Sequence, residues 1–206
     1  MPRRLRYGVA MSLDGFIAGP NGEHDWIVMD TSIDFAAMFK QFDTAVMGRK
    51  TYEVAIAHFG GHGALPGLDT TVFSRLLRPA THPGVRIVPD DPSETVAALK
   101  AKPGRDIWLY GGGMLFRTLL DAGLVDTVEV AVVPVLLGAG IPVLPKGSSM
   151  KLVLADHRAL PASGIVALSY AVPGGVGPAP RIEYIKPATP SRPAARARRP
   201  RTARPS

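Results

Sequence analysis

The chain has 206 residues, of which 46% are hydrophobic and 20% are charged, and none is cysteine. This length and composition predict one sizeable globular core, and no apolar run reaches the roughly 18 residues that a membrane helix needs. The absence of cysteine excludes disulfides, thiolate catalysis and cysteine-based zinc sites, and it fits a cytoplasmic protein.

The net charge of +7 is concentrated near the end of the chain. Residues 187–206 contain six arginines and no acidic residue, which leaves 18 of the 24 basic residues against all 17 acidic ones in residues 1–186. Residues 173–206 contain eight prolines and few large apolar side chains, so we expect a domain at 1–172 and a disordered tail at 173–206. The arginines of the tail either make weak charge contacts with nucleic acid or an acidic membrane, or only aid solubility.

The first predicted strand spans residues 5–11 and leads into a loop at 12–24 that is rich in glycine, proline and asparagine. Asp14 precedes a glycine in this loop, where a carboxylate either forms the turn or takes part in chemistry. Trp26 follows the loop and is either a packing anchor or the wall of a pocket.

A helix is expected next, capped by Thr31 or Ser32 and extending through Phe42. Its aromatic and methionine side chains recur at helical spacing, which is typical of one buried helix face. Asp34 lies in the first turn, where an acid either balances the helix dipole or binds a ligand.

A short buried strand at 44–47 ends at Gly48, and Arg49, Lys50 and Thr51 follow at the start of a predicted helix. Two cations at a helix N-terminus oppose the helix dipole. They make sense where an anion lies between them and the helix, so this junction favours a phosphate ligand.

Two further strands are predicted at 70–74 and 85–88, and the first of them ends at Ser74 and Arg75. A capped helix at 91–102 follows, with a proline at its first position.

The run 107–110 has the apolar character of a buried parallel strand, and three glycines follow it directly: Gly111, Gly112 and Gly113. Apolar residues then recur at helical spacing, so the free N–H groups of a new helix would face whatever lies over the turn. The turn is either a phosphate seat or a tight connection without a ligand. It departs from the Rossmann fingerprint at Phe116, where that motif has its third glycine.

A strand at 125–133 and an apolar bend at 134–142 come next. Two late strands at 152–160 and 165–172 are joined by a hairpin-like turn. Strands and helices alternate up to about residue 125, and strands dominate afterwards. This order predicts an α/β fold with a mostly parallel central sheet flanked by helices and an antiparallel C-terminal hairpin.

Four motifs, taken together, resemble the family that joins dihydrofolate reductase to the C-terminal reductase domain of the bifunctional riboflavin-biosynthesis enzyme. They stand in order along the chain: Ser12-Leu-Asp14-Gly-Phe-Ile-Ala, Met47-Gly-Arg-Lys-Thr-Tyr-Glu53, Gly111-Gly-Gly-Met-Leu115, and Gly123-Leu-Val-Asp126 with Val133-Pro-Val-Leu-Leu-Gly138. The resemblance covers about residues 5–172 and is greatest to stand-alone bacterial members. It implies a dihydrofolate-reductase-like fold, NADPH as hydride donor, and a homodimer with an interface at 125–143.

The resemblance also implies which residues bind NADPH. Three would lie on the nicotinamide side: Ala10, Ile17 and Trp26. Six match two strand ends that hold the pyrophosphate and the adenosine 2′-phosphate: Gly48, Arg49, Lys50, Thr51, Ser74 and Arg75. Five match the glycine turn under the pyrophosphate: Gly111, Gly112, Gly113, Met114 and Leu115.

Reduction of a C=N or C=O bond needs a hydride, which the cofactor supplies, and a proton from a protein acid or an ordered water. By resemblance, Asp34 takes about the place of the carboxylate that binds the pterin in dihydrofolate reductases, and Asp14 is the other catalytic candidate. Tyr110 stands where the riboflavin reductases have an acidic residue before the glycine turn. Neither the riboflavin intermediate nor dihydrofolate is therefore favoured as the substrate.

We expect an NADPH-dependent reductase that acts on a small heterocyclic substrate, pterin-like or pyrimidine-like. Two alternatives belong to other classes. One is a nucleotide-binding module without turnover, and the other is a protein that binds nucleic acid through residues 187–206.

Overall fold

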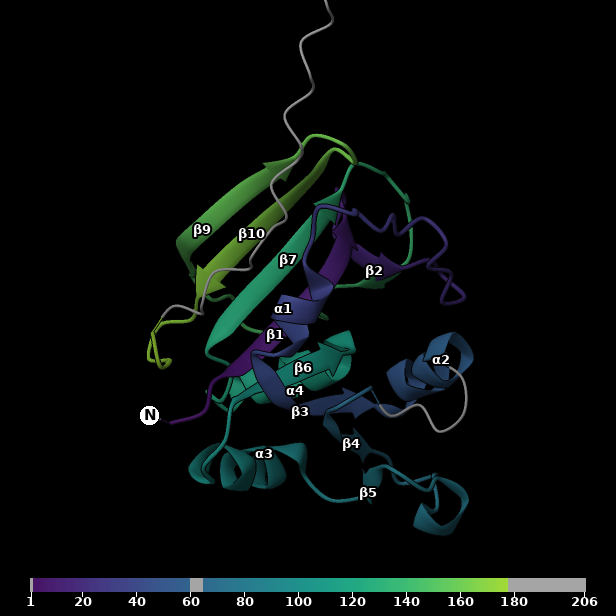
Figure 1. Ribbon diagram of the computed structural model, residues 1–206, viewed down its shortest axis with the longest axis vertical. Coiled ribbons are helices and arrows are strands. Elements are labelled where there is room, and N and C mark those ends of the chain that lie inside the picture. Colours follow the sequence, from purple (N-terminus) through teal and green to yellow (C-terminus); the bar gives the residue numbers. More distant parts are fainter. Residues whose placement is uncertain (1, 60–64, 178–206) are drawn as a thin grey trace, which may run out of the picture.

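The computed structural model describes residues 2–59 and 65–177. Within these ranges, eight strands form one central sheet: β1 (Leu5–Ser12), β3 (Phe42–Gly48), β4 (Asp69–Phe73), β5 (Arg86–Val88), β6 (Asp106–Gly111), β7 (Thr127–Val133), β9 (Val153–Leu160) and β10 (Ile165–Ala171). Their order across the sheet is β5-β4-β3-β6-β1-β7-β10-β9 (Figure 1). The first six pair in parallel, whereas β10 runs antiparallel to both β7 and β9. The predicted α/β fold and its antiparallel hairpin are confirmed.

In the described ranges, four α-helices cover the two faces of the sheet: α1 (Phe35–Phe39), α2 (Arg49–Phe59), α3 (Pro92–Ala101) and α4 (Gly113–Asp121). Side chains of α1 and α2 pack on one face, and side chains of α3 and α4 pack on the other. The alternation along β6 serves both layers, because Leu109 faces α3 and α4 while Trp108 faces α1 and α2. A separate two-stranded sheet pairs β2 (Phe16–Ala18) with β8 (Ile141–Pro142).

The carboxyl ends of the parallel strands bring the two glycine junctions to one edge of the sheet. Met47 pairs with Gly111 across β3 and β6, and Gly48 pairs with Phe73 across β3 and β4. In open parallel sheets, ligands bind outside this edge.

The first helix differs from its prediction at both ends. Asp34, rather than Thr31 or Ser32, caps α1, because its Oδ1 accepts a hydrogen bond from the backbone N–H of Ala37 at 2.9 Å. The helix ends at Phe39, and Phe42 instead begins β3 and is buried in the core. The strong apolar signal of Phe42 therefore belongs to a strand and not to the helix stripe.

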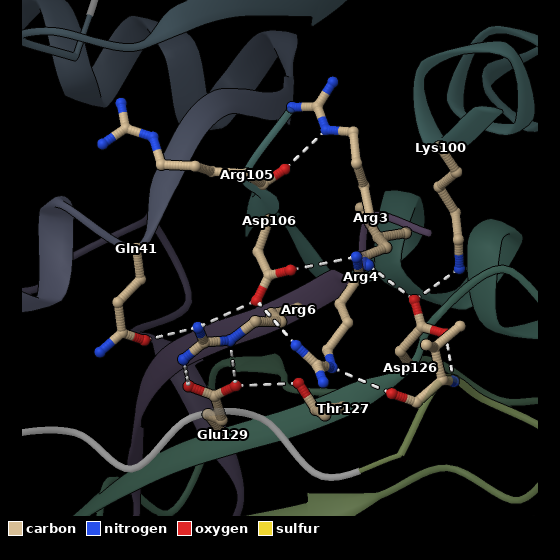
Figure 2. Close-up of polar contacts among 12 residues, drawn as sticks. Arg3, Arg4, Arg6, Gln41, Lys100, Arg105, Asp106, Asp126, Thr127 and Glu129 are labelled. Atoms are coloured by element: carbon tan, nitrogen blue, oxygen red, sulfur yellow. Dashed lines mark hydrogen bonds and ion pairs between the residues drawn. The ribbon is translucent and has the colours of Figure 1, made fainter. Parts of the chain in front are cut away.

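A buried ionic network closes the amino end of the sheet (Figure 2). The Arg6 guanidinium is 0% exposed and donates to both carboxylate oxygens of Glu129 at 2.7 Å. It also donates to Gln41 Oε1 at 2.6 Å, forms a 3.4 Å ion pair with Asp106, and lies 4.5 Å from the centre of the Phe42 ring. The network joins β1, β6, β7 and the turn after α1, at the end of the sheet opposite to the glycine junctions.

The described chain ends beside this network. Val176 donates its N–H to Asp126 Oδ1 at 2.9 Å, and its carbonyl accepts from Arg4 Nε at 2.9 Å. The rest of the predicted tail, including the arginines of 187–206, lies outside the described residues, as does the loop segment 60–64. No helix in the described ranges is long and apolar enough to cross a membrane.

Candidate active site

The glycine turn joins β6 to α4 at the carboxyl edge of the sheet. Gly111 has a φ of 139°, which side-chain-bearing residues rarely adopt, and its peptide bond to Gly112 is cis. Gly112 caps α4, and its carbonyl accepts the first intrahelical bond from Phe116 at 3.0 Å. The N–H groups of the first helical turn precede that bond, so they are available to an anion over the turn.

Thr51 brings the second glycine junction into contact with this turn. A β-carbon built on Gly112 would lie 3.2 Å from Thr51 Oγ1, and one built on Gly111 would lie 3.5 Å from the same oxygen. Thr51 belongs to the first turn of α2, so the N-termini of α2 and α4 flank one small region. Side chains at Gly111 and Gly112 would crowd the hydroxyl, whereas glycines leave it accessible.

The remaining residues of the predicted turn have different surroundings. A β-carbon on Gly113 would lie 2.8 Å from the carbonyl oxygen of Pro142, so this glycine permits close packing of the start of α4 against the backbone at Pro142. Leu115 is buried in the core with 7% exposure, and Met114 is 72% exposed. The side chain of Leu115 therefore anchors the helix, and only its backbone can reach a ligand over the turn.

The predicted phosphate-binding cations lie at neighbouring strand ends. Lys50 and Arg75 are exposed, at the start of α2 and just after β4. Ser74 holds the turn that contains Arg75, because its hydroxyl accepts hydrogen bonds from the N–H groups of Leu76 and Leu77 at 3.1 Å. Arg49 instead forms an exposed 2.6 Å ion pair with Glu53 on the same helix.

Two of the three residues predicted on the nicotinamide side pack in one apolar cluster. Ala10 and Trp26 lie against a core of Val133, Leu160 and Ile165, together with Ile33, Ala131 and Val135. Ile17 lies in β2, which is half-buried and pairs with β8.

A strip of small side chains continues from Ala10 across the sheet. Ala10 is in register with Ala131 of β7, and Ala131 is in register with Ala167 of β10. All three are partly exposed even though their strands are internal to the sheet. Such a surface suits a flat ring laid on the sheet, and no sequence motif indicated it, because the register of three strands defines it.

Asp14 connects two loops. Its carboxylate accepts hydrogen bonds from Ser12 Oγ at 2.6 Å, from the N–H of Gly138 at 2.7 Å and from the N–H of Leu137 at 3.0 Å. The Ser12 hydroxyl and then the two backbone N–H groups lower the pKa of Asp14. These donors favour the ionised carboxylate, which holds the two loops together. The catalytic role of Asp14 stays a prediction.

Asp34 keeps a place beside the apolar cluster. It is half-buried, and it follows Ile33, which packs in the same cluster as Ala10 and Trp26. Within the described part of the chain, only its Oδ1 is hydrogen-bonded, in the cap of α1. The geometry therefore allows the other oxygen to meet a ligand.

Tyr110 and Asp30 complete the surroundings of the site. Tyr110 is half-buried, its ring meets that of Trp108 edge-on at 4.9 Å, and burial raises the pKa of its hydroxyl. Asp30 is buried and hydrogen-bonds to Ser32 and Ser163. The signal in the sequence for this turn is Asp30 two residues before Ser32, a spacing at which an aspartate closes a turn with its side chain.

This sheet, with helix N-termini gathered at one carboxyl edge, is a dihydrofolate-reductase-like fold. The family model described as RibD C-terminal domain matches residues 68–166. An uncharacterized protein of Bacillus subtilis (strain 168), YyaP, is 33% identical over 179 residues, which cover 82% of this chain and 94% of that protein. The chain belongs to the same family as YyaP, and its residues 68–166 match the RibD C-terminal domain.

Solved structures confirm the fold. A putative riboflavin biosynthesis protein from Shewanella sp. PV-4 superposes with a TM-score of 0.69 at 25% identity, over 84% of this chain and 99% of that one. Dihydrofolate reductase from Enterococcus faecalis, complexed with NADP(H) and RAB-propyl, superposes with a TM-score of 0.59 at 19% identity, over 82% of this chain and 96% of that one. The second likeness concerns the fold alone.

Proposed function

We propose that this protein is an NADPH-dependent reductase that transfers hydride to a C=N or C=O bond of a small, pterin-like or pyrimidine-like substrate. The observation that carries the proposal is the closeness of Thr51 to the Gly111-Gly112 turn, which supports one anion site between two helix N-termini. The match of residues 68–166 to the RibD C-terminal domain supports a reductase. The presence of NADP(H) in the Enterococcus faecalis relative supports the cofactor.

The residues of this edge fit a pyrophosphate and a second phosphate. The glycines leave the space that a β-carbon would take, and the N–H groups of α4 and the Thr51 hydroxyl can donate to pyrophosphate oxygens. Lys50 and Arg75, both exposed, would meet the adenosine 2′-phosphate, and a cation there favours NADPH over NADH. Arg49 can join them once it leaves Glu53.

Bound NADPH would supply the hydride, so the chain has to place the two rings and provide a proton. Ala10, Ile17 and Trp26 would line the nicotinamide, and the strip through Ala131 and Ala167 would support the substrate ring. Asp34 would deliver the proton, directly or through one water.

The test is a screen of pterins, pyrimidines and quinones for NADPH oxidation, followed by Asp34→Asn. Asparagine caps a helix as well as aspartate does, so this change removes the acid while keeping the start of α1. We expect turnover to fall at least about tenfold with NADPH affinity unchanged. Asp91→Asn, at the cap of α3, is the matched control and should leave turnover unchanged.

Two outcomes would contradict parts of the proposal. Unchanged turnover in Asp34→Asn would remove Asp34 from proton transfer. NADPH binding without oxidation by any compound of the screen would favour a nucleotide-binding module.

We also propose a homodimer, at a different surface from the one the sequence suggested. Strand β7 lies between β1 and β10, so the first half of segment 125–143 has no free edge. The edge strand β9 instead exposes Val153 and Leu154 by 61% and 51%. Light scattering of the wild type and of Leu154→Lys tests this. A dimeric wild type and a monomeric variant are expected, and a monomeric wild type would contradict the proposal.

A further inference from the structure

Asp30 holds together two parts of the chain that are distant in the sequence. It is 3% exposed and lies between Trp26 and the start of α1. Its Oδ1 accepts hydrogen bonds from the N–H of Ser32 at 2.8 Å and from the Ser32 hydroxyl at 2.6 Å. Its Oδ2 accepts from the hydroxyl of Ser163 at 2.5 Å. One carboxylate is thus shared between the segment before α1 and the turn between β9 and β10.

The far end of this link leads into the apolar cluster of the candidate site. The Ser163 hydroxyl accepts a hydrogen bond from the N–H of Ile165 at 3.3 Å. Ile165 is buried, and Trp26 and Ile33 pack against the cluster that contains it. The polar link and the apolar contacts therefore join the same two pieces of chain, and Asp30 is the charged group between them.

Besides these apolar contacts, few backbone hydrogen bonds hold the segment around Asp30. Val28 and Met29, which precede Asp30, are largely exposed, and regular helix begins only at Phe35. The backbone closes a turn from the N–H of Ile33 to the Asp30 carbonyl at 3.2 Å, the N–H of Phe35 bonds to the Ile33 carbonyl at 3.0 Å, and Ile33 forms a β-bridge. A buried, hydrogen-bonded carboxylate is costly to leave with fewer donors, so its three bonds strongly favour one arrangement of this segment.

We propose that Asp30 is a positioning residue of the reductase site: it fastens the segment that carries Trp26, Ile33 and Asp34 to the β9–β10 turn. The inference rests on the proposed function for the meaning of this segment, in which Trp26 would line the nicotinamide and Asp34 would meet the substrate. Asp30 does not touch the reacting atoms in this account. It acts through the positions of Trp26 and Asp34.

The test uses the two tryptophans of the chain, Trp26 and Trp108. In a Trp108→Phe background, Trp26 is the sole indole, and acrylamide quenching of its emission reports how firmly the segment is held. Asp30→Ala and Ser163→Ala should each raise the quenching constant, by about twofold or more for Asp30→Ala, because local opening exposes the ring. NADPH affinity should fall by less than about tenfold, since the phosphate seat is a separate part of the site and only Trp26 of this segment would line the nicotinamide.

Asp91→Ala is the matched control. Asp91 accepts a hydrogen bond from the N–H of Ser93, two residues on, as Asp30 does from Ser32. Asp91, however, caps α3 on the other side of the sheet. This variant should leave the quenching of Trp26 unchanged. Asp30→Asn should restore part of the wild-type value, because an amide can accept from Ser32 and donate to a reoriented Ser163 hydroxyl.

The outcomes separate this inference from the proposed function. Unchanged quenching in folded Asp30→Ala and Ser163→Ala proteins would overturn the positioning role, and Ser163→Ala alone decides the matter if Asp30→Ala does not fold. Absence of NADPH binding in the wild type would instead refute the proposed function. In that case the quenching still shows whether Asp30 holds the segment.

Discussion

A β-carbon on Gly112 would lie 3.2 Å from the hydroxyl oxygen of Thr51. This closeness brings together two motifs that are far apart in the sequence, the glycine turn before α4 and the first turn of α2. Each junction alone is an ordinary strand-to-helix connection. Together they place two helix N-termini and a hydroxyl around the same few ångströms, which is the arrangement a pyrophosphate requires.

Gly112→Ala should therefore weaken cofactor binding more than folding. The backbone of Gly112 is extended, with a φ of −97°, so alanine fits the conformation, and the new methyl group meets only the end of the Thr51 side chain. We expect NADPH affinity to fall about tenfold and stability to fall by less than about 1 kcal/mol. Calorimetric titration and urea unfolding measure the two quantities.

Gly113→Ala is the comparison for that variant. Its β-carbon would meet the Pro142 carbonyl at 2.8 Å, and backbone cannot give way as a side chain can. Stability should fall by about 1–3 kcal/mol. The account is contradicted if Gly112→Ala is the less stable of the two and binds NADPH like the wild type.

Glu53→Gln should raise the affinity for NADPH. The ion pair of Arg49 with Glu53 is exposed and worth only about 0.3–0.5 kcal/mol, so the loss to stability is small. The released Arg49 would be free to meet the 2′-phosphate, which carries more charge than a carboxylate. We expect a gain of about two- to fivefold for NADPH, none for NADH, and a smaller gain at high salt. An equal gain for both nucleotides would place Arg49 away from the 2′-phosphate.

The Asp14 link should open in acid. Hydrogen bonds from Ser12, Gly138 and Leu137 lower the folded-state pKa of Asp14 below its unfolded value. The link therefore contributes fully to the free energy of unfolding at pH values above the ordinary aspartate pKa of about 3.9. This contribution is lost as the pH falls through the lower pKa of the folded state. The difference in melting temperature between the wild type and Asp14→Asn should shrink in that range. A difference that grows on acidification would show that the folded pKa is raised.

Glu129→Ala should be strongly destabilising although it lies far from the glycine turn. Glu129 is the bidentate partner of the fully buried Arg6, which would keep only its weaker contacts with Asp106 and Gln41 (Figure 2). Removing one partner of a buried pair costs about 3–5 kcal/mol. Urea unfolding of Glu129→Ala and of the double variant Arg6→Met/Glu129→Met measures this, and the double variant should be the more stable one. A loss below about 1 kcal/mol in Glu129→Ala would contradict the role of the network.

Local patterns in the sequence predicted most of the fold. Runs such as 107–110, followed by glycines and an apolar helix, define a parallel strand and its exit without any tertiary information. The same holds for the late hairpin of β9 and β10. The predicted end of α1 was wrong because Phe42 fits the apolar face of a helix and a buried strand equally well. Only the tertiary position of β3 decides between the two.

The parts of the candidate site that lie in local motifs were open to prediction from the sequence. The parts that depend on strand register or on long-range contacts were not. The glycines, Thr51 and the cations follow from strand-to-helix junctions, which local sequence shows. The alanine strip depends on the register of β1, β7 and β10, and the link from Asp30 to Ser163 spans 133 positions of sequence. The role of Asp14 likewise depends on a loop that only the folded chain brings to it.

Thermal unfolding of the full chain in NADPH and in NADH tests the central claim most directly. A ligand present at about a hundred times its dissociation constant adds about 2.7 kcal/mol to the free energy of unfolding. We predict that NADPH raises the melting temperature more than NADH does, and that the double variant Lys50→Ala/Arg75→Ala removes this difference. No rise with either nucleotide would contradict the account.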